Sequence, residues 1–276
     1  MKFPQTNGEL PPGGVQLCPE VVRYKLGGHW YHHLPTGTWM KGLTRILKNE
    51  PMDEGLIRYI ASQGGYDQYK ENLGKAALRG TMVHKGIERL LNGLEIDTDR
   101  YGLEEIAHLQ SFIRLCANHV LDTRAIEEPV WDLERQIATC IDWRGLFDGK
   151  HTTANWKTSK AVYDSAKTQA NEEAILFNGM ARFDDLGPVE QWAVVRTNAN
   201  FPSRYQIVTG EIDERRHQYF ECLYDIEAFR DEKWEPEFPP PIPKILSLPQ
   251  LKNGETREPI RNGHSNGHAG NGKPRP

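Results

Sequence analysis

The sequence predicts an α/β protein with a mixed central β-sheet flanked by helices. Segments with strand-like alternation and segments with helical spacing follow one another along the chain, as expected of a layered α/β domain. Asp148-Gly149 lies between two strand-like runs and predicts a tight hairpin, because both residues tolerate positive φ. The patterns leave the order of strand pairing open.

The individual elements follow from hydrophobic periodicity. Leu73, Ala77, Val83 and Ile87 recur at helical spacing, and Gly93 suits the end of that helix. Helices are expected at 53–63, 66–91, 103–120, 165–183 and 214–230, and strands at 21–26, 29–33, 128–142, 154–157, 191–196 and 205–210.

The 276-residue chain is expected to contain three segments. Residues 1–50 form an N-terminal β-hairpin lead-in, and residues 51–234 form the main domain. Residues 235–276 are rich in Pro, Gly and Asn and have few apolar side chains beyond Leu251, so a disordered tail is expected there.

Composition excludes several classes of protein. A net charge of −4 argues against a protein that coats nucleic acid, although a local basic groove remains compatible with it. No apolar run is long enough to span a membrane, and no signal pattern begins the chain. The four cysteines are far apart in sequence and form no Cys-x-x-Cys pair, so a cytoplasmic protein without a zinc site or disulfide framework is expected. The chain has no phosphate-binding loop, no Gly-x-Ser-x-Gly elbow and no His-Glu-x-x-His pair.

Chemistry is most strongly indicated in the predicted hairpin at 137–160. Side chains alternate across a strand, so Asn155 and Lys157 share one face while Trp156 points away, and the returning hairpin brings Asp142 towards them. An acid and an amide oxygen can hold a hard divalent cation, and a nearby lysine can stabilise charge that develops during phosphodiester hydrolysis. On spacing alone, solvated surface residues explain the same pattern.

Five motifs in order resemble the RecB-like branch of the PD-(D/E)XK nuclease superfamily. Residues 79–88 (RGTMVHKGIE) resemble the helix motif of that family, and 128–134 (EPVWDLE) resemble the strand with its first glutamate. Residues 138–142 (ATCID) resemble the segment with the metal-binding aspartate, and 155–160 (NWKTSK) resemble the signature strand. Gln169 matches the glutamine motif. The resemblance covers about residues 28–210 and implies a restriction-endonuclease-like core.

The resemblance implies a divalent-metal-dependent deoxyribonuclease, with an exonuclease favoured, acting in phage-like DNA replication, recombination or repair. Its cofactor would be Mg²⁺ or Mn²⁺, and its partners would be DNA and recombination or replication proteins, in the cytoplasm of a bacterium or phage-infected host. The implied metal ligands are Asp142, Asn155, Glu128 and His84, and the implied catalytic residues are Lys157, Asp142, Glu128 and Gln169. Glu127 and Glu134 compete with Glu128 for its role.

Two positions depart from the family pattern. Asn155 stands where the family has an acidic residue, and Thr139-Cys140 replaces a Gly-Thr pair. An amide oxygen can contact a cation but lacks the negative charge that drives Mg²⁺ binding. The rival hypothesis is therefore a silenced nuclease fold that binds DNA or organises a complex.

Overall fold

A computed structural model describes residues 12–25, 27–52, 54–180, 184–198 and 204–230. All of these residues belong to one compact unit. The tail expected at 235–276 lies outside the described residues, as do the last residues of the helix expected at 165–183.

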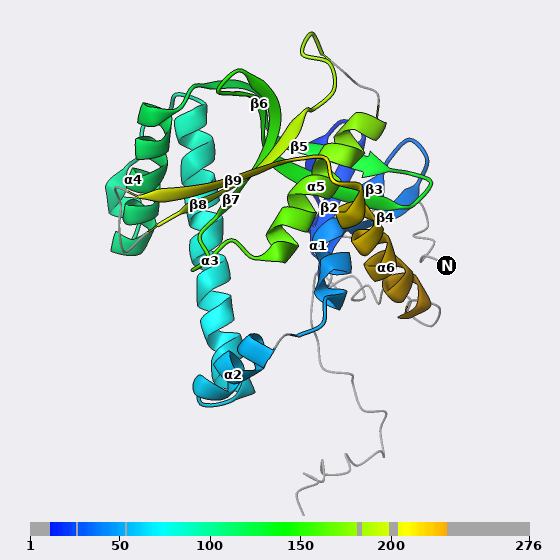
Figure 1. Ribbon diagram of the computed structural model, residues 1–276, viewed down its shortest axis with the longest axis horizontal. Coiled ribbons are helices and arrows are strands. Elements are labelled where there is room, and N and C mark those ends of the chain that lie inside the picture. Colours follow the sequence, from blue (N-terminus) through cyan, green and yellow to red (C-terminus); the bar gives the residue numbers. More distant parts are fainter. Residues whose placement is uncertain (1–11, 26, 53, 181–183, 199–203, 231–276) are drawn as a thin grey trace, which may run out of the picture. The chain divides into compact units, whose positions relative to one another are not determined.

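The described part of the chain is organised around one mixed β-sheet (Figure 1). Its strands are β1 (Val15–Cys18), β2 (Val21–Lys25), β3 (His29–His33), β4 (Thr38–Gly42), β5 (Leu121–Asp132), β6 (Ile137–Phe147), β7 (Lys150–Lys157), β8 (Gln191–Thr197) and β9 (Tyr205–Glu211). They are ordered β1-β2-β3-β4-β6-β7-β8-β9, and β5 pairs with β6 beside this path. The β4–β6 and β7–β8 pairs are parallel and the remaining pairs are antiparallel.

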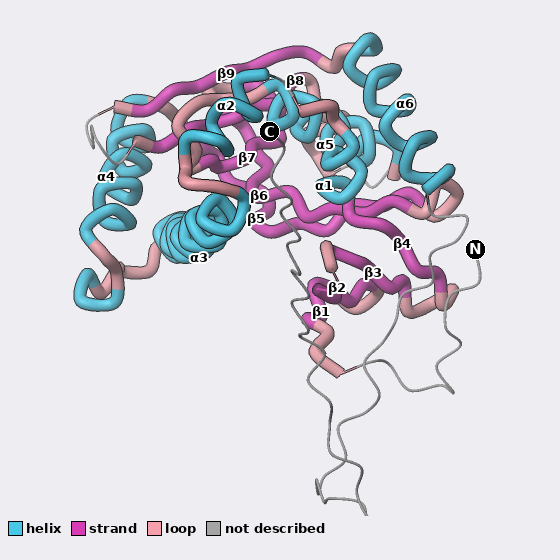
Figure 2. The backbone as a smooth tube through the Cα atoms, turned by 90° about the horizontal axis from the view of Figure 1, so that it is seen from below, coloured by secondary structure: helices cyan, strands magenta, loops and turns pink. Residues whose placement is uncertain are grey.

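Helices cover both faces of the β6–β9 region (Figure 2). On one face lie α3 (Tyr66–Leu91) and α4 (Leu103–Asn118), and on the other lie α1 (Leu43–Ile46), α5 (Asp164–Gly179) and α6 (Glu214–Arg230). The 3₁₀ turns η1 (Leu47–Asn49) and η2 (Thr98–Arg100) join neighbouring helices, and α2 (Glu54–Ser62) precedes α3. Because both faces are covered, β6, β7 and β8 are buried along almost their whole length.

The long helix α3 has two different halves. Its C-terminal half contributes Val83 and Ile87 to the core, whereas Leu73 and Leu78 in its N-terminal half are 53% and 71% exposed. Figure 1 shows this first half running past the sheet towards α2. The buried half of α3 is the part that reaches the hairpin of β6 and β7.

The α/β class and the mixed sheet flanked by helices are confirmed. Helices α3 and α6 have the predicted bounds, and Asp148 and Gly149 take positive φ angles of 49° and 85° in the predicted hairpin turn. Strands β1 and β4 were not predicted, and the single strand expected at 128–142 is divided between β5, which begins at Leu121, and β6, with a turn at 133–136 between them. Since β4 pairs with β6, the lead-in strands continue the sheet of the main domain. In the described residues, no helix combines the length and apolarity needed to cross a membrane.

Candidate metal-binding site

The hairpin of β6 and β7 places Asp142 against the backbone of the signature strand. The Trp156 amide donates a hydrogen bond of 2.8 Å to Asp142 Oδ2. The Trp156 ring is buried on the α3 and α4 side of the sheet, where it contacts Phe112 at a centroid distance of 5.2 Å. Its neighbours Asn155 and Lys157 therefore face α5, as alternation predicts.

Helix α3 contributes His84 to the same place. His84 Nε2 lies 2.9 Å from the Trp156 carbonyl oxygen, and because a carbonyl only accepts, Nε2 must carry a proton. Nδ1 lies 3.5 Å from Asp142 Oδ1. Burial lowers the pKa of His84, but the Asp142 carboxylate outweighs burial and leaves that pKa above its ordinary value. A neutral His84 would present the Nδ1 lone pair on the Asp142 side, which is the tautomer that a metal ligand needs.

Glu127 completes a group of three candidate ligands. His84, Glu127 and Asp142 each offer one ligand atom, and these atoms lie within 4.8 Å of one another. Glu127 has a left-handed φ of 51°, and its neighbours pair with Trp143 and Ile141, so it stands opposite Asp142. The Cys140 thiol donates to Glu127 Oε2 at 3.5 Å.

Glu128, the glutamate favoured from sequence, has a different partner. Its carboxylate accepts hydrogen bonds from Arg144 Nε at 2.6 Å and from the second terminal nitrogen at 3.2 Å. Arg144 also binds Asp184 at 2.8 Å and stacks over Phe177. The structure thus corrects the expectation for Glu128: Glu127 stands beside Asp142, because the positive φ at Glu127 interrupts the simple alternation of the strand.

A chain of hydrogen bonds connects the signature strand to α5. Lys157 Nζ donates to Gln169 Oε1 at 2.9 Å, and Gln169 Nε2 donates to Asn155 Oδ1 at 3.3 Å. Gln169 Nε2 also donates to Glu173 Oε1 at 2.8 Å. The structure therefore brings together Asn155, Lys157 and Gln169, which were all predicted as site residues.

Glu173 was not predicted as a site residue. It lies one helical turn beyond Gln169, so both side chains project from the same face of α5. That spacing was the available signal, but a glutamate in a helix is usually solvated. In the fold Glu173 has no exposed surface and also accepts a hydrogen bond of 3.1 Å from Thr139 Oγ1.

Negative charge accumulates in this region with few positive groups to balance it. Burial, and then the charge of Asp142, raise the pKa of Glu127 above its ordinary value. The same two causes raise the pKa of Glu173 to about 7. Burial raises the pKa of Asp142 as well, but the charges of His84 and Lys157 outweigh it and bring that pKa below its ordinary value. A bound divalent cation would relieve this repulsion, so the donor set fits the metal that the resemblance implies.

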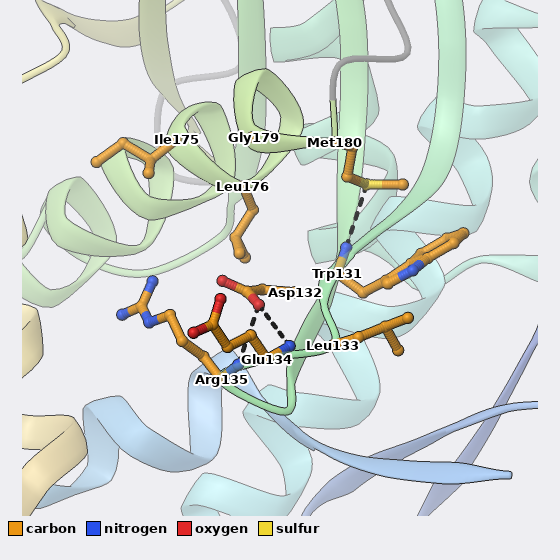
Figure 3. Close-up of a pocket in the computed structure, with 9 residues that line it drawn as sticks. All are labelled: Trp131, Asp132, Leu133, Glu134, Arg135, Ile175, Leu176, Gly179 and Met180. Atoms are coloured by element: carbon orange, nitrogen blue, oxygen red, sulfur yellow. Dashed lines mark hydrogen bonds between the residues drawn. The ribbon is translucent and has the colours of Figure 1, made fainter. Parts of the chain in front are cut away.

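A separate open cavity of about 430 Å³ lies between the β5–β6 turn and the C-terminal end of α5 (Figure 3). Two of its polar side chains already have partners within the protein. Asp132 Oδ1 accepts from the backbone amides of Glu134 and Arg135, and Arg135 forms an ion pair with Glu221. These contacts support the turn and do not resemble a catalytic set.

No family model matches the chain, and no curated protein matches it.

Proposed function

We propose that this protein is a divalent-metal-dependent deoxyribonuclease with a restriction-endonuclease-like core of the RecB-like PD-(D/E)XK type. The observation that carries the proposal is the convergence of His84, Glu127 and Asp142 from three separate elements, with ligand atoms within 4.8 Å of one another. DNA as the substrate, and an exonuclease in phage-like replication, recombination or repair, are taken from the motif resemblance.

Each site residue has a defined task in this proposal. Asp142, Glu127 and His84 would hold Mg²⁺ or Mn²⁺, which when bound polarises a phosphoryl oxygen and helps to generate hydroxide from water. Lys157 would stabilise the negative charge that develops on the phosphate. Gln169 holds the Lys157 ammonium through its side-chain oxygen and so fixes the direction from which the lysine acts.

The test compares cleavage and binding in the same variants. Wild-type protein should cleave end-labelled single- or double-stranded DNA with Mg²⁺ or Mn²⁺ and should be inactive in EDTA. Asp142→Ala should abolish cleavage while DNA affinity stays within about threefold of wild type, because the variant loses a cation ligand and not a phosphate contact. Lys157→Ala should also abolish cleavage. Lys150→Ala, at the exposed start of the same strand, is the matched control and should remain active.

The second candidate function is a silenced nuclease fold that binds DNA, and Asn155 is the observation that favours it. Wild-type protein that binds DNA but does not cleave it with either cation would support this candidate. If the protein does not bind DNA even at low salt, where phosphate contacts are strongest, both candidates lose their common premise.

A further inference from the structure

An amide and a carboxylate form a buried pair between β7 and α5. Asn155 Nδ2 donates a hydrogen bond of 2.5 Å to Glu173 Oε2. Asn155 is 1% exposed and Glu173 is 0% exposed, so both partners of this hydrogen bond are shielded from solvent. Gln169 and Thr139 donate to the other carboxylate oxygen. Glu173 therefore collects three hydrogen bonds and has no cationic partner among them.

This pair fixes the direction of the Asn155 amide. The Lys157 ammonium can only donate, so Gln169 directs its oxygen to Lys157 and its amino group to Asn155 and Glu173. The Asn155 oxygen therefore accepts from Gln169, and the Asn155 amino group faces Glu173. An aspartate at position 155 could not donate this bond, and it would bring a second carboxylate to within contact of Glu173.

We propose that Asn155 and Glu173 are an exchanged pair, in which α5 carries the carboxylate that the nuclease motif places on the signature strand. This inference rests on the proposed function, because the negative charge is needed only if the site holds a cation. Glu173 lies outside the group of three ligands and is a positioning residue. It adds negative charge beside the cation and orients Asn155 and Gln169, and through Gln169 it orients Lys157.

The exchange predicts a specific dependence between the two positions. Glu173→Gln alone removes the charge and should weaken cation binding. Asn155→Asp alone places two carboxylates in contact and should destabilise the cation-free protein. The double variant restores one amide and one carboxylate in swapped places, and a glutamine at position 173 can donate to an aspartate at position 155. Each single change should therefore be harmful, and the two together should compensate.

The experiment uses the full chain in four forms: wild type, Glu173→Gln, Asn155→Asp and the double variant. Mn²⁺ binding is measured at pH 8 by titration. Binding that persists in Asp142→Ala is subtracted, so that only the site containing Asp142 is counted. Thermal midpoints are measured in EDTA. Glu173→Gln should bind Mn²⁺ about tenfold more weakly, and the double variant should return to within about threefold of wild type. Asn155→Asp should lower the cation-free midpoint, and the double variant should recover most of that loss.

Glu172→Gln is the matched control. Glu172 is the neighbouring residue on α5 and is 1% exposed, but its carboxylate binds His217 at 2.9 Å instead of Asn155. This variant should leave the Mn²⁺ affinity of the Asp142 site unchanged. Combining it with Asn155→Asp should not recover the thermal midpoint that Asn155→Asp lowers.

The proposal is overturned if Glu173→Gln keeps its Mn²⁺ affinity within about twofold of wild type, or if the double variant binds no better than Glu173→Gln. Wild-type protein that binds no cation at Asp142 would refute the proposed function. The exchanged pair would then be tested by the thermal midpoints alone. It is refuted if Asn155→Asp does not lower the midpoint, or if the double variant does not recover the loss. Cation-dependent cleavage without compensation would refute the pair and leave the proposed function standing.

Discussion

The buried carboxylate of Glu173 should make the stability of the cation-free protein depend on pH. Burial, followed by the charge of Asp142, raises the pKa of Glu173 from 4.5 to about 7. Each pKa unit corresponds to about 1.4 kcal/mol, so keeping Glu173 charged in the folded protein costs about 3 kcal/mol. The side chain has no exposed surface, so solvent screening does not reduce this value.

The direction of the effect follows from proton linkage. Between pH 4.5 and about 7 the folded protein holds a proton on Glu173 that the unfolded chain has released. The free energy of unfolding therefore falls as the pH rises through this window, and the contribution of Glu173 becomes constant above it. The glutamine side chain in Glu173→Gln does not titrate, so the free energy of unfolding of this variant should not show this contribution to the fall with pH.

The assay is urea unfolding of wild type and Glu173→Gln in EDTA at pH 5 and pH 8. Wild type should lose about 2–3 kcal/mol more than the variant between the two pH values. The comparison cancels other groups that titrate in the same range, because both proteins contain them. Equal losses in the two proteins, or a larger loss in the variant, would show that Glu173 is not held in a charge-excluding environment.

Further predictions concern the framework around the site. Gly145→Ala should cost about 1–3 kcal/mol or more in urea unfolding, because the new Cβ would lie 2.0 Å from the backbone oxygen of Asp122. Gly74→Ala, on the exposed half of α3 where no atom lies within 4 Å, should instead stabilise the protein by about 0.5–1 kcal/mol; the reverse order would contradict this packing. Arg144→Met should cost about 2–3 kcal/mol, because it leaves two partly buried carboxylates without their partner. Arg58→Ala, in an exposed ion pair, should change stability by less than about 0.5 kcal/mol, and a comparable loss in both arginine variants would refute the distinction.

The parts of the fold that were predicted from sequence are those governed by local pattern. The helical spacing in 66–91 and the Asp148-Gly149 turn depend on neighbouring residues, and both are confirmed. The pairing of β4 with β6 depends on residues nearly one hundred positions apart, namely Lys41 with Ile137 and Gly42 with Ala138. No local pattern encodes such a contact, so the sequence left the order of strand pairing open and did not predict how the lead-in segment joins the sheet.

In the candidate site, too, local sequence pattern predicted some residues correctly, and others depend on the tertiary structure. Alternation along β7 correctly placed Asn155 and Lys157 on the face opposite Trp156. On β5 the motif resemblance favoured Glu128 and left Glu127 as an alternative; in the fold Glu127 adopts a positive φ that few glutamates adopt, and it stands beside Asp142. Glu173 was missed because its role arises from the packing of α5 on the sheet and is not visible in the helix sequence.

The environment of Glu173 also bears on whether Asn155 indicates a silenced site. From sequence alone, Asn155 marks the loss of a carboxylate. In the fold, the carboxyl group of Glu173 is in direct contact with Asn155, so an acidic group remains in the same place. A glutamine at position 173 would fill nearly the same volume and would avoid the cost of about 3 kcal/mol that the buried charge imposes at neutral pH. Groups held at such a cost are concentrated at sites where the charge serves binding or catalysis. The retained acidic group therefore favours a cation-binding site over a silenced fold.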